Sequence, residues 1–181
     1  MVNKKELKDT LSSIITKNSV FVCVGTTRAL FDAFAPWHGD CLKAKGIPVY
    51  GTSDKNVNAL TMFASLNKIY NKDKVPMENI IGIDSAVTYT EEKKNKIEVR
   101  IDAPIYPGAG VGKQLPTIGR HSIVMYTLTN DEVDDVMNGY KSGFGTLTDI
   151  ADVEKIIDNA RMLADIIEEV YLEKGGKLVH E

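Results

Sequence analysis

The sequence predicts an α/β protein, a three-layer α/β/α sandwich with a mostly parallel central sheet. Short apolar runs rich in β-branched residues alternate with amphipathic stretches of helical period, in the order β-α-β-α-β. A glycine or a carboxylate closes each apolar run, as is typical of strands buried on both faces of a sheet. Because 181 residues with 43% hydrophobic side chains suffice for one well-buried domain, residues 1–181 are expected to form a single domain.

The first half of the chain supplies this alternation. Apolar residues recur at helical spacing near the N-terminus and again in two stretches that we expect to cross over the sheet. The second crossover, "NVNALTMFASLNKIY", is predicted to bury a face made of Leu60, Phe63 and Ala64. In chain order, the predicted elements are a helix at 3–17, a strand at 19–25, a helix at 29–45, a strand at 47–51, a helix at 56–70 and a strand at 78–84.

The second half is less regular. The segment "KIEVRIDA" (96–103) alternates apolar and polar residues and predicts an antiparallel edge strand, whereas "HSIVMYTL" (121–128) predicts a further buried strand. Thr129, with Glu132 three residues later, has the pattern of a capping box that opens a short helix. Apolar residues at helical spacing then predict a long amphipathic helix at about 149–174, ended by two glycines.

Charge and composition limit the partners and the compartment. A net charge of −3 gives no reason to expect nucleic acid or an acidic membrane surface, because both usually require a basic face. No stretch approaches the roughly 18 apolar residues of a membrane span, and we expect a cytoplasmic protein. Cys23 and Cys41 lack the spacing of a zinc or redox motif and are expected to be buried thiols. The choice between a single chain and a homo-oligomer stays open.

A glycine-rich loop, "YPGAGVGKQLPTIG" (106–119), raises the question of phosphate binding. A Walker-type loop needs a glycine where this chain has Pro107, and a serine or threonine where it has Gln114. A dinucleotide fingerprint fails as well, because Lys113 occupies the place of its third glycine. Loops of this length tend to be functional, so we expect this one to form a wall of a cleft; a surface loop without a role is the alternative.

Two carboxylates follow predicted strands at the edge where α/β proteins bind ligands, beyond the carboxyl ends of parallel strands. Asp84 directly ends the run "IIGID", and Asp32 follows the first strand after the short loop "GTTRALFD". If the two strands are neighbours, the carboxylates share one cleft, where close negative charges keep one of them protonated. The alternatives are local roles, with Asp32 as a helix cap and Asp84 bonded to backbone amides.

The three histidines add one further candidate. His121 follows the glycine-rich loop and starts a predicted strand, so it is the candidate third member of a site with the two aspartates. His38 and His180 are expected to lie in solvent.

Four segments of the chain carry a family resemblance: "VGTTRALFDAFAP", "VYGTSDKNVNAL", "IGIDSAV" and "PGAGVGKQLPTIG". In this order and at about this spacing, they resemble the signature segments of the YyaC-type sporulation proteins. That family is related in fold to germination proteases and hydrogenase maturation endopeptidases. The resemblance covers about residues 19–128, and its most specific piece is the glycine-rich loop.

The resemblance implies a phosphorylase/hydrolase-like fold, a cleft at the strand ends and a peptidase ancestry. It points to Asp32 and Asp84, the same two acids that the predicted topology selects. Phe31 and Ala35 replace glycines of the family pattern, and three further departures alter its polar residues: Thr27 replaces an aspartate, Asn58 stands where histidine is common, and Arg120 stands where an acidic residue is common. These changes remove negative charge or its partners and add positive charge, so a site that has changed its ligand is an alternative to a hydrolase.

Three functional hypotheses follow. The first is a peptide hydrolase of the sporulation and germination protease type, in which Asp32 and Asp84 share a water and act on a peptide or a small spore protein. The second is a non-catalytic binding or regulatory module that holds an anionic small molecule or an acidic peptide. The third is a divalent metal held by Asp32, Asp84 and His121, similar to the arrangement in the hydrogenase maturation relatives; no other cofactor is expected. The candidate binding residues are Gly25, Thr26, Arg28, Gly108, Gly110, Lys113 and Arg120.

Overall fold

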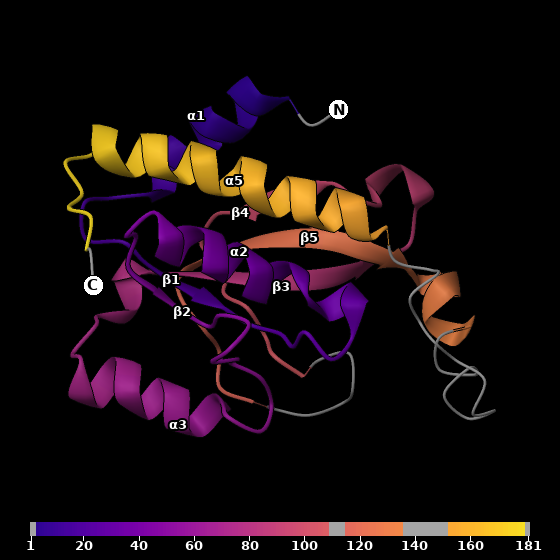
Figure 1. Ribbon diagram of the computed structural model, residues 1–181, viewed down its shortest axis with the longest axis horizontal. Helices are drawn as coiled ribbons and strands as arrows, with labels where there is room; N and C mark the ends of the chain where they lie inside the picture. The colour runs from indigo at the N-terminus through magenta and orange to yellow at the C-terminus, as the bar shows by residue number, and fades with distance from the viewer. Residues whose placement is uncertain (1–2, 109–114, 136–151, 180–181) are drawn as a thin grey trace.

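The computed structural model describes residues 3–108, 115–135 and 152–179, which form a five-stranded sheet with helices on both faces (Figure 1). The strand order is β2-β1-β3-β5-β4. The first four strands of this order are parallel, and the edge strand β4 is antiparallel to β5, which confirms the predicted antiparallel edge. The strands are β1 Val20–Cys23, β2 Val49–Tyr50, β3 Ile80–Thr88, β4 Ile97–Arg100 and β5 His121–Thr129.

Helices cover the sheet in two layers. α1, α2 and α5 lie on one face and α3 lies on the other, so the predicted α/β/α sandwich is confirmed (Figure 1). None of the helices within the described ranges is long and apolar enough to cross a membrane. The helices are α1 Lys4–Ile14, α2 Phe34–Ala44, α3 Met62–Leu66 and α5 Val153–Glu173; the shorter turns are η1 Leu30–Asp32, η2 Asn67–Lys72, η3 Met77–Asn79 and η4 Glu91–Lys93.

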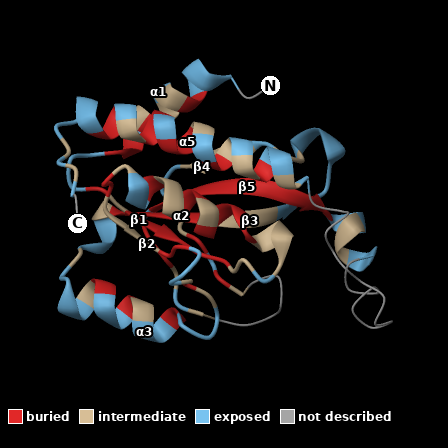
Figure 2. Ribbon diagram, in the orientation of Figure 1, coloured by how far each residue is buried: buried red, intermediate tan, exposed pale blue. Residues whose placement is uncertain are grey.

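β1 contributes to two cores, one on each face of the sheet. Its alternate residues Phe21 and Cys23 pack toward α2 and α5, whereas Val22 and Val24 pack toward α3. Figure 2 shows the buried residues concentrated in the sheet and on the helix faces turned toward it. The apolar run at 19–25 is therefore a strand buried on both faces, as its composition predicts. Both cysteines are free thiols; Cys23 is buried as expected, and Cys41 is only partly buried.

α5 is the long amphipathic helix that the sequence predicts. Asp152 begins it, because its Oδ1 accepts a 3.0 Å hydrogen bond from the backbone N–H of Lys155. Gly175, with φ of +79°, ends it in the left-handed conformation that glycine adopts without strain. Residues 149–151 of the predicted helix lie outside the described residues.

A buried histidine lies between α2 and α5, and here the sequence prediction of a solvated His38 was wrong. His38 is fully buried, stacks on Phe34 at 5.8 Å between ring centroids, and has Nδ1 2.8 Å from the carbonyl oxygen of Ala160. Burial lowers its pKa to about 4, so the ring is neutral at pH 7 and Nδ1 carries the proton that it donates to Ala160. The helical pattern alone did not show that α5 covers this face of α2.

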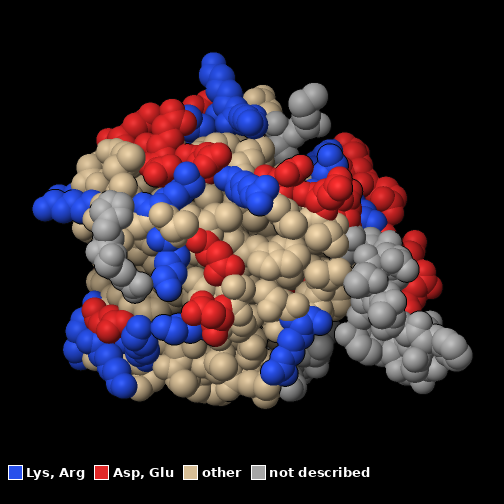
Figure 3. Space-filling model, in the orientation of Figure 1, with Lys and Arg blue, Asp and Glu red and all other residues tan. Residues whose placement is uncertain are grey.

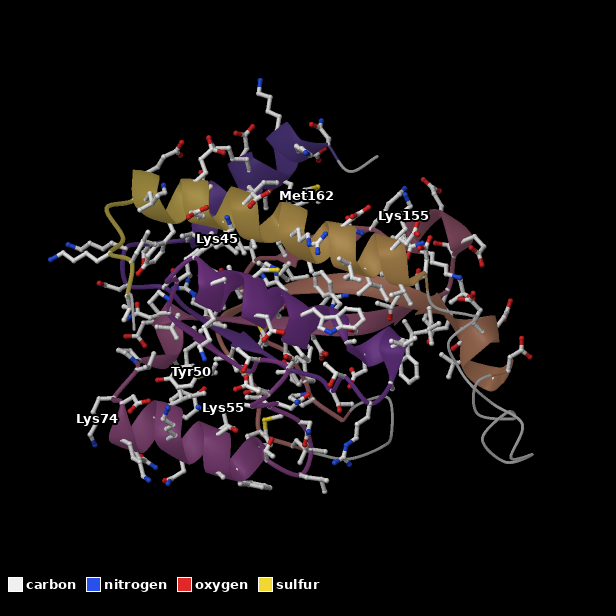
Figure 4. The ribbon with its side chains drawn as sticks, viewed as in Figure 1. Lys45, Tyr50, Lys55, Lys74, Lys155 and Met162 are labelled. Atoms are coloured by element: carbon white, nitrogen blue, oxygen red, sulfur yellow. The ribbon has the colours of Figure 1, made fainter. Side chains whose placement is uncertain are left out.

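Charged side chains tie the exposed edges of these two helices together. Lys45, at the end of α2, extends to α5, where its Nζ lies 2.8 Å from Asp165 and 2.7 Å from Glu168 (Figure 4). On the face that Figure 3 shows, basic and acidic side chains are interspersed in this manner. Pairs of this kind are individually weak, so the α2–α5 packing depends mainly on the buried apolar residues.

The buried face of α3 differs from the predicted one. The helix begins at Met62 rather than near residue 56. The side chains that face the sheet are therefore not the predicted ones. Leu60 is 88% exposed and Phe63 is 66% exposed, and Ala64 is exposed as well. The residues that α3 and η2 bury are Met62, Leu66 and Ile69.

The predicted capping box is present at the start of the helical residues 130–135. The Thr129 backbone N–H donates to Glu132 Oε2 at 2.7 Å, and the Glu132 N–H donates to Thr129 Oγ1 at 3.4 Å. The substitution Thr129→Val keeps the shape of the side chain and removes its hydroxyl group. We expect it to lower the free energy of unfolding by about 1 kcal/mol in urea denaturation. A variant as stable as the wild type would show that the box does not stabilise this helix.

Candidate active site

Asp32 reaches the end of β1 because the intervening loop folds back on itself. Gly25 has φ of +146°, and a Cβ at this position would lie 2.4 Å from the carbonyl oxygen of Asp32. Glycine is therefore required for this close approach. The Thr26 N–H donates a 2.8 Å hydrogen bond to Asp32 Oδ2. Two residues predicted to bind ligand, Gly25 and Thr26, thus position the Asp32 carboxyl group at the carboxyl end of the sheet.

Asp84 lies on the neighbouring strand at the same edge. The sequence predicts that its strand ends at Asp84, whereas β3 continues to Thr88 along β5. On its other side, however, β3 pairs with β1 only as far as Ile83 with Cys23. Asp84 is the first β3 residue beyond this pairing, so it lies at the carboxyl end of β1, where Asp32 also lies.

The two carboxyl groups interact electrostatically. Burial raises the pKa of Asp32 to about 7, and the hydrogen bond from Thr26 opposes that rise. Burial also raises the pKa of Asp84 well above its ordinary value, and the negative charge of Asp32 raises it further. Asp32 is therefore the first to lose its proton, and Asp84 stays protonated while Asp32 is ionised. As whole residues, both are of intermediate burial.

The pair can supply a base and an acid at the same pH. An ionised Asp32 accepts a proton, and a protonated Asp84 donates a hydrogen bond or a proton. The expected local roles are also present in part, since Thr26 bonds to Asp32 and Asp84 Oδ1 accepts from the N–H of Ser85 at 2.8 Å. These bonds leave oxygen atoms on both carboxyl groups for a water or a substrate.

A pocket of about 350 Å³ lies beside Thr26, the residue whose N–H binds Asp32. One side comes from the loop after β1 and the other from the loop after β2 and the residues leading into α3. Thr26 belongs to both features, because its side chain lines the pocket and its N–H binds Asp32. Arg28 is exposed at the pocket, as expected for a binding residue. The lining residues are Thr26, Thr27, Arg28, Ser53, Asn56, Asn58, Leu60 and Thr61, with no carboxylate among them.

Two local features fix the side of the pocket that is formed by the loop after β2 and the residues leading into α3. Gly51 has φ of +87°, and a Cβ there would lie 1.9 Å from the carbonyl oxygen of Cys23, so only glycine lets the β2 loop approach β1 this closely. Asn58 Oδ1 accepts from the N–H of Leu60 at 2.9 Å and fixes the turn before α3. The Asn56 Oδ1 atom is buried and, within the described residues, has no hydrogen-bond partner.

His121 and Arg120 lie at the opposite edge of the sheet, so their predicted membership of the site was wrong. His121 starts β5 and pairs with Ile81, whereas Asp84 pairs with Val124, three residues further along, or about 10 Å in a strand. His121 Nδ1 accepts a 3.0 Å bond from the N–H of Asp102, and Arg120 Nε donates to Asp102 Oδ1 at 2.6 Å.

The three-ligand metal site is therefore not assembled. Among the residues that the structure describes, no group of three histidine, cysteine, aspartate or glutamate side chains lies close enough to hold a metal ion. The physical reason is that a residue at the start of a parallel strand cannot meet residues at the carboxyl ends of its neighbours.

The stem of the glycine-rich loop lies on the α3 face of the sheet. Ile105 and Ile118 pair with each other, and both pack in the core beneath α3. Ile105 approaches Gly82 so closely that a Cβ at that glycine would lie 2.6 Å from Ile105 Cδ1. Gly108 has φ of +77°. The predicted binding residues Gly110 and Lys113 lie outside the described residues.

Several pocket residues were not singled out from the sequence. They belong to "TSDKNVNALT" (52–61), which directly follows a predicted parallel strand, so the rule that selected Asp32 and Asp84 also applies to them. The polar side chains that follow this strand could have indicated the pocket residues. The pocket members missed in this way are Ser53, Asn56 and Thr61.

The fold and the site define a class of protein: an α/β/α sandwich with an interacting pair of carboxyl groups at the carboxyl end of a mostly parallel sheet. The chain belongs to the family described as "Protein of unknown function (DUF1256)", whose model matches residues 2–158. It is also 33% identical over 122 residues to the uncharacterized protein YyaC of Bacillus subtilis (strain 168). That match covers 64% of this chain and 58% of the Bacillus protein.

Proposed function

We propose that this protein is a peptide hydrolase in which Asp32 and Asp84 are the catalytic residues. The observation that carries the proposal is the interacting carboxyl pair, in which Asp32 has a pKa of about 7 and Asp84 a higher one. Perturbed pKa values of this kind concentrate at catalytic sites because acid–base chemistry near neutral pH needs them. The position of the pair at the carboxyl end of the parallel strands agrees with where α/β enzymes act.

In the proposed reaction, ionised Asp32 removes a proton from water while the water oxygen attacks the carbonyl carbon of the peptide bond. Asp84 donates its proton to the carbonyl oxygen, which gives a neutral tetrahedral intermediate. The intermediate collapses as the C–N bond breaks. The departing nitrogen takes the proton from Asp32, and the hydroxyl proton returns to Asp84 as the new carboxyl group forms. The pair ends the cycle with one proton, as it began.

The proposed substrate is a peptide or a small acid-soluble spore protein. Peptide backbones present both hydrogen-bond donors and acceptors, and the adjoining pocket offers both: hydroxyl and amide groups throughout, with a buried acceptor at Asn56. The resemblance to sporulation proteins with protease relatives supports the same class of substrate.

The direct test is incubation of the protein with purified small acid-soluble spore proteins, followed by mass spectrometry of the products. Cleavage at defined positions is expected from the wild type and not from Asp84→Asn. Asp102→Asn is the matched control, because Asp102 is a carboxylate at the opposite edge of the sheet. Cleavage that survives in Asp84→Asn would contradict the assignment of Asp84, and no cleavage of any peptide by the wild type would contradict the proposed function.

One observation favours a second candidate function, the binding of an anionic small molecule or acidic peptide without hydrolysis. Arg28 is exposed beside a pocket that no carboxylate lines. A ligand carboxylate or phosphate there meets positive charge and hydroxyl donors. If this function holds, acidic peptides raise the melting temperature of the wild type but not of Arg28→Gln, and no product forms. Equal stabilisation of both proteins would exclude it.

A further inference from the structure

A charged cluster on β4 and β5 shares a face of the sheet with Asp84. Asp84 pairs with Val124, and Val124 pairs in turn with Glu98 of β4, so these three residues form one row across three strands. Residues that are paired across strands, or two apart along one, point to the same face. Arg100, two residues after Glu98, and Tyr126, two residues after Val124, therefore lie on the face to which Asp84 points.

Hydrogen bonds place the Arg100 guanidinium over this row. The backbone of Arg100 pairs with Ser122 on one side of the row, and Tyr126 lies on the other side of it. Arg100 Nη2 nevertheless donates to Tyr126 Oη at 2.9 Å, and its Nε donates to Glu98 Oε1 at 2.8 Å. The side chain must therefore extend along the sheet toward its carboxyl end. The guanidinium therefore lies over β4 and β5, and β5 is the strand that pairs with β3, which carries Asp84.

The cluster is held rigidly and is positive overall. Glu98 receives hydrogen bonds from both Arg100 and Tyr126, and Lys93 Nζ lies 3.7 Å from Glu98 Oε2. Tyr126 lowers the pKa of Glu98, so that carboxylate stays charged and the three ionised groups sum to one positive charge. The same positive charge acts on Asp84, whose pKa Arg100 lowers against the larger effect of burial.

The Arg100 guanidinium has N–H donors that are not used in these hydrogen bonds. A guanidinium group carries five N–H donors, and the contacts within the described residues engage Nε and Nη2 only, which leaves Nη1 free. The Arg100 side chain is 38% exposed, so these donors are open to a ligand. A hydrogen-bonded, partly exposed guanidinium on the same face of the sheet as Asp84, whose pKa it lowers, can bind a carbonyl or carboxylate oxygen.

We propose that Arg100 is a third functional residue of the site, whose guanidinium binds the substrate oxygen beside the Asp32–Asp84 pair. The inference rests on the proposed hydrolysis: Arg100 binds the carbonyl oxygen of the peptide bond and, after cleavage, the carboxylate of the product. That carboxylate forms next to Asp32, which would repel it in ionised form; the guanidinium offsets the repulsion.

The test measures product binding and therefore does not require turnover. N-acetylalanine carries the carboxylate of a cleaved peptide, and N-acetylalanine amide is its neutral counterpart. Each is titrated at pH 6 while the backbone amide signals of the protein are followed by NMR, a readout that the Arg100 variants keep. We expect the wild type to bind the carboxylate at least about tenfold more tightly than the amide. Binding of the carboxylate should weaken as the pH rises through about 7, where Asp32 ionises.

Arg100→Gln is expected to lose the preference for the carboxylate, and Arg100→Lys to keep part of it. Lys96→Gln is the matched control, because it removes a nearby positive charge that pairs with Glu92 rather than with the cluster, and it should behave as the wild type. Far-UV circular dichroism checks that each variant is folded; if Arg100→Gln is not folded, the comparison of Arg100→Lys with Lys96→Gln decides. A wild type without preference, or a preference that survives in Arg100→Gln, overturns the inference.

The two proposals can fail separately. Carboxylate binding that requires Arg100 in a protein that cleaves nothing would sustain the oxygen-binding role and contradict the hydrolase. Hydrolysis with unchanged kcat and KM in Arg100→Gln would sustain the hydrolase and contradict the role of Arg100.

Discussion

Asp32→Asn and Asp84→Asn are each expected to reduce peptide hydrolysis by a factor of about 10² to 10⁴, the usual contribution of a positioned acid or base. The pH profile of kcat/KM should identify which residue has which role. Asp32 must be ionised, so activity should rise as the pH increases toward about 7, by about tenfold for each pH unit on the acidic side. Asp84 must be protonated, so activity should fall again at a higher pH, set by its larger pKa.

Because the two carboxyl groups interact, the two limbs of this profile belong to the pair rather than to either residue alone. Steady-state assays between pH 4 and pH 10 measure the acidic limb and show whether the activity falls again at higher pH. Asp102→Asn should keep the full profile. Two results would contradict the idea that the pair shares one proton, and with it the roles assigned to the two residues. One is a profile of kcat/KM that is flat across neutral pH; the other is a profile with only one limb that is the same in the wild type and in Asp84→Asn.

The same Asp32→Asn substitution is expected to stabilise the folded protein above pH 7 while it removes activity. The folded state raises the pKa of Asp32 from 3.8 to about 7, so it binds the proton more tightly than the unfolded chain does. The stability that Asp32 contributes is therefore full below about pH 4 and is lost as the pH rises through about 7. Asparagine is neutral throughout and avoids this loss. We expect a gain of about 2–4 kcal/mol in the free energy of unfolding at pH 8.

Urea denaturation at pH 4 and pH 8 measures this difference. The two proteins should be nearly equal in stability at pH 4 and should diverge as the pH rises. For Asp102→Asn we expect the opposite effect, a lower free energy of unfolding at pH 8 than the wild type. The reason is that the hydrogen bond from Arg120 lowers the pKa of Asp102 and stabilises the folded state once that carboxylate is ionised. An Asp32→Asn variant that is less stable than the wild type at pH 8 would show that the ionised carboxylate is better solvated than its burial indicates.

The order of the elements could be predicted because each depends on local pattern. The run at 19–25 is apolar at consecutive positions and forms the interior strand β1, and the alternating segment at 96–103 contains the edge strand β4. The α3 region shows where local pattern fails. Leu60 and Phe63 are apolar and suitably spaced, yet the helix starts after Leu60 because Asn58 caps the preceding turn, and both side chains are exposed.

The candidate site could be predicted in part. Asp32 and Asp84 were identified because the carboxyl ends of parallel strands lie together, a rule that needs only the order of the strands. The same rule failed for His121, which begins its strand instead of following it. No pattern indicated Arg100, because it reaches the site from an antiparallel edge strand through side-chain hydrogen bonds to Glu98 and Tyr126.

The sequence by itself determined the α/β class, the interior strand β1, the capping box and the two acids of the candidate site. These follow from hydrophobic period, turn chemistry and chain order, which act over a few residues. Only the tertiary structure decided that His38 is buried and neutral, that Asp32 ionises before Asp84, and that Arg100 lies on the same face. Each of these depends on burial and on charges brought together from distant parts of the chain.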